Sequence, residues 1–148
     1  MAVPEVDFAQ VFRQLPIPVL LVTPDLVIAD ANVAYLQVLS RTREELIGRD
    51  LFEAFPDNPA DPEATGVRNI RDSMRRAMAT GEPDTVAFQR YDVEVPGRPG
   101  VFEHRYWCPV IAPVVGPDGR VAFISACVEE LTHKVRRFVE GLPSEEQD

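Results

Sequence analysis

The stretch VVGPDGRVAFISACVEELTH, residues 114–133, decides the fold because two apolar runs meet at a turn and the second then becomes charged. Pro117 fixes φ for a turn, Asp118 can hydrogen-bond to its own backbone and Gly119 tolerates a positive φ. The apolar runs CPVIAPVV and RVAFISACV flank this turn, so we predict a β-hairpin. The change to charged residues predicts that a final helix begins at Glu129.

Composition limits the classes of protein that need considering. The chain has 148 residues, the size of one domain, and a formal net charge of −9, which disfavours a nucleic-acid partner. It has no apolar stretch near the roughly 18 residues of a membrane span, and its first residues do not resemble a signal peptide. Its cysteines, Cys108 and Cys127, form neither a disulfide framework nor a metal motif, so we expect a cytoplasmic location.

Helices and strands alternate irregularly before the hairpin. Residues 5–15 have apolar positions near helical spacing, and 19–32 read as a compact hairpin. Asn32 is a good N-cap for a helix, and Thr42 begins a capping box for the next one. The longest helix is expected over 67–81.

The strands TVAFQRYDVEV and VFEHRYWCPVIAPVV follow this helix and precede the closing strand. Antiparallel strands around a group of helices indicate an α+β domain.

Three motifs in this order resemble those of PAS domains. The resemblance extends from about Phe12 to Lys134 and is carried by IADANVAY (Asn32, Ala34 and Tyr35), by TREELIGRDLFEAFP (Glu45, Leu46 and Gly48) and by GPDGRVAFISACVEELTHK. In the last motif, Glu130, Leu131 and Thr132 stand where the family usually has Asp-Ile-Thr. The longer Glu130 side chain is a departure from that triplet.

The resemblance implies a five-stranded antiparallel sheet with short helices on one face, an internal cavity, and flanking N- and C-terminal helices. It divides the chain into an N-terminal amphipathic helix (1–15), a PAS domain (16–132) and a C-terminal signalling helix with a tail (133–148). Glu130, Leu131 and Thr132 would relay a signal from the sensor to the final helix.

Candidate pocket residues come from the predicted helices and from two predicted strands. Strict alternation puts His104 and Tyr106 on one strand face and Arg105 and Trp107 on the other, and either face could point inward. An Arg beside aromatic rings would suit a carboxylate or a planar polar ligand. Alternatively, the charges lie on the solvent face and Trp107 lies in a dimer interface. The candidates are Tyr35, Phe52, Phe55, Ile70, Met74, Phe88, Arg90, His104, Arg105, Tyr106 and Trp107.

The sequence identifies no cofactor and disfavours two classes, heme and covalent flavin. The predicted long helix lacks the axial His of heme-binding PAS domains, and RDLFEAFPDNPAD lacks the reactive Cys of covalent flavin photosensors. We expect no metal site and no catalytic residues. Two readings of Cys108 and Cys127 stay open: neighbours that form a redox switch, or two small buried side chains.

These observations favour a sensory PAS module of a signalling system, such as a two-component system. It would bind a small molecule or a partner and relay a conformational change to an output domain. The alternative is a ligand-free dimerisation and protein-interaction module. We expect a homodimer, with no nucleic acid and no membrane among its partners.

Overall fold

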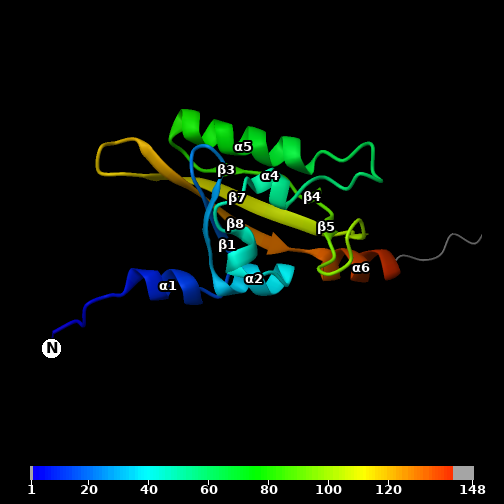
Figure 1. Cartoon of the computed structure of the whole chain (residues 1–148), viewed down its shortest axis with the longest axis horizontal. Coiled ribbons are helices and arrows are strands. Elements are labelled where there is room, and N and C mark those ends of the chain that lie inside the picture. The colour runs from blue at the N-terminus through cyan, green and yellow to red at the C-terminus, as the bar shows by residue number, and fades with distance from the viewer. Residues whose placement is uncertain (1, 142–148) are drawn as a thin grey trace, which may run out of the picture.

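The chain folds into a curved antiparallel sheet with helices packed against one face, in a computed structural model that describes residues 2–141 (Figure 1). The elements are α1 (Phe8–Gln14), β1 (Val19–Val22), β2 (Ile28–Ala31), α2 (Val33–Leu39), α3 (Arg43–Leu46), α4 (Leu51–Ala54), α5 (Gly66–Thr80), β3 (Asp84–Thr85), β4 (Gln89–Arg90), β5 (Val93–Glu94), β6 (Phe102–Glu103), β7 (Tyr106–Val115), β8 (Val121–Glu130) and α6 (Thr132–Glu140).

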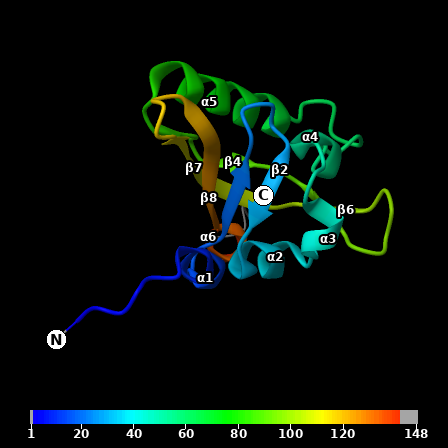
Figure 2. The same ribbon diagram turned by 60° about the vertical axis from the view of Figure 1, so that its left-hand side comes forward.

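The main sheet has the strand order β2-β1-β8-β7-β3, and β4 also pairs with β7. The position beside β7 is therefore shared by two short segments, β3 and β4. Helix α5 runs along the sheet, and α2, α3 and α4 lie near its β1–β2 end (Figures 1 and 2). The predicted α+β class with a PAS-like antiparallel sheet is confirmed.

The hairpin predicted from residues 114–133 is confirmed, but its second strand is longer than expected. Val110 pairs with Cys127, and the Gly119 amide donates to the Gly116 carbonyl oxygen (3.0 Å) in a turn where Gly119 has φ 80°. The prediction that a helix begins at Glu129 is wrong, because β7 continues to supply partners and Glu129 lies opposite Cys108.

Asn32 explains why the first of the three motifs matters to the fold. Its buried side-chain oxygen accepts from the Tyr35 amide (3.0 Å), which caps α2, and from the Val19 amide (2.9 Å). Its amide nitrogen donates to the Ile17 carbonyl oxygen (2.8 Å). One side chain thus fixes the start of α2 against the start of β1. The predicted cap at Thr42 is also confirmed, since its hydroxyl accepts from the Glu45 amide.

The two long strands predicted before and after PGRPG are each interrupted. Between them, β5 and β6 form a separate small sheet in which Val93 lies opposite Glu103. The chain leaves the main sheet after β4 and returns only at Tyr106, because the Pro- and Gly-rich turn closes a local hairpin.

The helix predicted over 5–15 is shorter, and most of its apolar residues are exposed. Helix α1 is capped by Asp7 and contains no buried residue, and Phe8 is 76% exposed. No helix within residues 2–141 combines the length and the apolar character needed to cross a membrane. The tail predicted beyond residue 141 lies outside the described residues.

Candidate functional site

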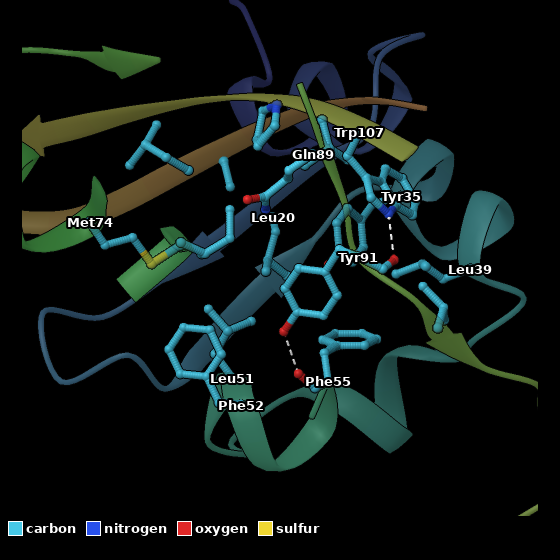
Figure 3. A pocket seen from close by; sticks show the side chains of 16 residues that line it. Leu20, Tyr35, Leu39, Leu51, Phe52, Phe55, Met74, Gln89, Tyr91 and Trp107 are labelled. Atoms are coloured by element: carbon cyan, nitrogen blue, oxygen red, sulfur yellow. Dashed lines mark hydrogen bonds between the residues drawn. The ribbon is translucent and has the colours of Figure 1, made fainter. Parts of the chain in front are cut away.

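An apolar cavity of about 80 Å³ lies between the inner face of the sheet and the helices (Figure 3). The sheet contributes residues from β1, β4, β7 and β8, and the helices contribute residues from α2, α4 and α5. The lining residues are Leu20, Tyr35, Leu39, Leu51, Phe52, Phe55, Ile70, Met74, Gln89, Tyr91, Val93, Trp107, Pro109, Ile111, Ala126 and Val128.

Two polar groups in this lining are satisfied by backbone carbonyl oxygens. The Tyr91 hydroxyl donates to the Phe55 carbonyl oxygen, and Trp107 Nε1 donates to the Tyr91 carbonyl oxygen (2.9 Å), as the dashed lines in Figure 3 show. Burial raises the pKa values of both Tyr91 and Tyr35, so both phenols are neutral. Gln89 differs, because its buried Nε2 has no hydrogen-bond partner within residues 2–141.

Some of the pocket residues predicted from the sequence line this cavity, and the others lie outside it. Tyr35, Phe52, Phe55, Ile70, Met74 and Trp107 line the cavity. The structure places Phe88, Arg90, His104, Arg105 and Tyr106 elsewhere. The prediction of a carboxylate ligand loses its basis, because no charged residue is among the lining residues described.

Arg90 and His104 gather around a carboxylate near the small β5–β6 sheet. Both oxygens of the buried Asp92 accept from Arg90 (2.8 Å each), and Asn58 Nδ2 donates to Asp92 Oδ2 (2.9 Å). His104 Nδ1 lies 3.1 Å from that oxygen. This cluster ties the loop before α5 to the start of the β5–β6 hairpin.

Phe88 and Tyr106 stack on the opposite, outer face of the sheet. Their ring centroids are 5.4 Å apart and nearly parallel, and Phe88 is 51% exposed. The buried side chain is Trp107, so the inner face of β7 is the one that carries Trp107, Pro109 and Ile111. The register of the sheet thus decides which of the alternating residues meet the cavity.

Arg105 lies beyond the end of the cavity, where α2, β7 and β8 meet. Its guanidinium donates to the Val38 carbonyl oxygen (2.6 Å) at the end of α2 and to Glu130 Oε2 (3.4 Å), and to Glu103. The Thr132 hydroxyl donates to Glu130 Oε1 (2.8 Å). Glu130 therefore bridges β7 and the first residue of α6.

The backbone strengthens this junction. The Leu131 amide donates to the Tyr106 carbonyl oxygen (2.8 Å), and the Tyr106 amide donates to the Thr132 hydroxyl (3.2 Å). Leu131 and Thr132 are thus hydrogen-bonded to Tyr106 of β7, and Glu130 is hydrogen-bonded to Arg105 and to Thr132.

The lining residues that the sequence did not indicate are mostly small or aliphatic strand residues. Gln89, Tyr91 and Val93 alternate along the chain, but the register Gln89↔Trp107 was needed to place Gln89 on the inner face. The remaining ones are Leu20, Leu39, Leu51, Pro109, Ile111, Ala126 and Val128.

Cys108 and Cys127 are free thiols and lie diagonally across β7 and β8. Cys108 is opposite Glu129, and Cys127 is opposite Val110. Such diagonal pairs have Cα atoms about 7–8 Å apart, which a disulfide does not span without backbone movement. The geometry therefore does not support the redox switch.

The sequence matches the family model described as PAS fold over residues 12–136. The chain therefore belongs to the PAS-fold family, as its three motifs predicted. PAS domains are sensory modules of signalling proteins and are generally non-catalytic. No curated protein matches this sequence.

Solved PAS structures share the fold at low sequence identity. A PAS domain from Colwellia psychrerythraea superposes with a TM-score of 0.66 at 13% identity, covering 85% of this chain and 95% of that one. A sensory box sensor histidine kinase from Vibrio cholerae gives 0.56 at 18% identity, with 84% and 89% covered. The PAS domain of nitrogen regulation protein NR(II) from Vibrio parahaemolyticus gives 0.60 at 12% identity, with 85% and 99% covered.

Proposed function

We propose that this PAS domain binds a small molecule in the cavity and relays its occupancy to an output domain through β8 and α6. The observation that carries the proposal is that a wall of the cavity runs directly into a helix. Ala126 and Val128 of β8 line the cavity, and α6 begins at Thr132. A ligand that favours one packing of β8 would shift the population of α6 positions.

The junction of Arg105, Glu130 and Thr132 supports a relay role for the triplet 130–132. It holds the end of β8, the start of α6 and the end of α2 in one hydrogen-bonded group. A displacement of β8 by the ligand would therefore strain bonds that also fix α6. In this proposal, residues 16–132 sense and 133–148 transmit, and the effector is a two-component or other signalling domain in the cytoplasm.

The test combines native mass spectrometry with amide hydrogen exchange. Ala126→Leu adds bulk inside the cavity, and Ala112→Leu is its matched control because Ala112 lies on the outer face, opposite Ser125. We expect a molecule that co-purifies with the wild type and with Ala112→Leu to be lost from Ala126→Leu. We also expect exchange at the amides of Leu131 and Val135 to change only in Ala126→Leu.

Two results together would contradict the proposal. One is a folded wild type that carries no bound molecule in native spectra. The other is equal exchange in α6 for the two variants. An ultraviolet–visible spectrum of the same sample tests for a coloured cofactor. Absorbance beyond roughly 350 nm would contradict the prediction that heme and flavin are disfavoured.

A second candidate function, homodimerisation, is favoured by the outer face of the sheet. Side chains on this face of β7 and β8 carry no charge from Val110 to Val114 and across from them, where Cys127, Ser125 and Phe123 lie, and Val110, Val114 and Phe123 are exposed. Glu129, opposite Cys108, marks the charged end of this face. On a chain with a net charge of −9, such a face lets a second copy approach without close repulsion. Val110→Lys should then lower the mass measured by light scattering from that of a dimer to that of a monomer. A wild type with the mass of a monomer would exclude this function.

A further inference from the structure

We propose that the cavity selects a compact, uncharged molecule whose hydrogen-bond acceptor meets Gln89 Nε2. This inference rests on the proposed function and names the chemical class of its ligand. It is carried by a buried amide donor that has no hydrogen-bond partner among the described residues and belongs to a side chain of the largely apolar lining (Figure 3).

The other end of the Gln89 amide is already engaged. Asn69 Nδ2 on α5 donates to Gln89 Oε1 (3.0 Å) and also to the Thr65 hydroxyl oxygen (3.3 Å). This arrangement leaves Nε2 as the free donor of the Gln89 amide.

A buried donor without a partner destabilises the empty protein, and a ligand acceptor removes that cost. Two other donors of the lining are already engaged, because the Tyr91 hydroxyl and Trp107 Nε1 both donate to backbone carbonyl oxygens. Gln89 Nε2 is a fully buried donor of a lining residue, and a ligand carbonyl or ether would meet its need for an acceptor.

The lining also excludes charged ligands. Its residues are aliphatic, aromatic or neutral, and Arg90, His104 and Arg105 are bonded to Asp92 or to groups at the α6 junction. A carboxylate or an ammonium group would lose its hydration without gaining an opposite charge.

The cavity volume limits the size of the molecule. A single water needs roughly 10–15 Å³ by this measure, so a cavity of about 80 Å³ holds roughly five to eight non-hydrogen atoms. A flavin or a heme is several times larger. Small ketones, ethers and aldehydes fall within this range.

The test uses cyclohexanone, toluene and pentanoate, which have the same number of non-hydrogen atoms, as probes. Of cyclohexanone and toluene, only the ketone has a strong acceptor. Binding to the wild type and to Gln89→Leu is measured by ¹H–¹⁵N NMR, which follows the Trp107 indole signal. We expect Gln89→Leu to weaken cyclohexanone binding about fivefold and to change toluene binding by less than about twofold. Pentanoate, which differs in being charged, should bind neither protein.

The possible outcomes separate the two proposals. If neither neutral probe binds the folded wild type, the cavity does not bind small molecules and the proposed function fails. If both bind and the substitution affects them equally, or if pentanoate binds as well as the ketone, only the inferred selectivity fails. If Gln89→Leu does not fold, the wild-type Gln89 side-chain NH₂ signals decide. They should shift with the ketone and not with toluene, and equal shifts would overturn the inference.

Discussion

Replacing Arg105 by Ala should destabilise the protein much more than an ordinary surface substitution. Arg105 and Glu130 are only 18% and 20% exposed, and the Arg105 bond to the Val38 carbonyl oxygen is short at 2.6 Å. Loss of a charged donor to this carbonyl costs about 2 kcal/mol, and the 3.4 Å contact with Glu130 adds about 0.5 kcal/mol. We therefore expect the free energy of unfolding to fall by about 2.5 kcal/mol.

Urea unfolding followed by the fluorescence of Trp107 measures this change. Trp107 is the single tryptophan and is 7% exposed, so its emission reports the loss of the core. With a slope of about 2 kcal/mol per M, the midpoint should fall by roughly 1 M. Amide exchange at Leu131 should accelerate in the same variant, because its bond to Tyr106 belongs to the same junction.

Lys134→Ala is the matched control at this junction. It breaks an ion pair with Glu129 (3.2 Å) in which both side chains are more than half exposed, and such pairs contribute less than about 1 kcal/mol. If Arg105→Ala shifts the midpoint no more than Lys134→Ala does, Arg105 does not hold the junction together and the relay argument fails.

Three further substitutions test other parts of the structure. Burial by itself raises the pKa of Asp92, but hydrogen bonds, that of Arg90 foremost, hold the pKa at about 2, below the ordinary 3.8. Its contribution to stability is therefore complete above about pH 4 and is lost as the pH falls toward 2, and Asp92→Asn should flatten this part of a pH series of urea midpoints. Gly66→Ala would place a Cβ 2.5 Å from the Tyr91 ring, so it should cost roughly 1–3 kcal/mol in urea unfolding and be rescued by adding Tyr91→Leu. Met74 is 1% exposed, so Met74→Ala should cost about 2–4 kcal/mol, and NMR titration should then detect binding of probes larger than cyclohexanone. A pH series that Asp92→Asn leaves unchanged would contradict the first expectation. A urea midpoint that Gly66→Ala or Met74→Ala leaves unchanged would contradict the second or the third.

Local chemistry made much of the fold predictable from the sequence. Asn32 and Thr42 are caps that act within three residues of themselves, and the turn at 116–119 is specified by its own Pro, Asp and Gly. The aromatic and aliphatic helix residues of the cavity, such as Phe55 and Met74, are predictable because helical periodicity already assigns them to a buried side.

The strand residues of the site were harder to predict, because the face of the sheet on which each side chain lies depends on pairing with strands distant in the chain. The β5–β6 hairpin interrupts both long strands, so alternation read through His104 and Arg105 does not describe one continuous strand. Gln89 meets the cavity only because it pairs with Trp107. A single residue of register would have turned it to the other face.

The interruption between β3 and β4 also affects how molecules of this protein can meet one another. A long, regular edge strand offers unpaired backbone groups on which another chain can add a strand, and this is a common first step toward fibrils. Here each edge segment has two residues, and Asp84 and Arg90 place charges on them. We expect this edge to be a poor template for amyloid growth, even at the high concentrations used for crystallisation.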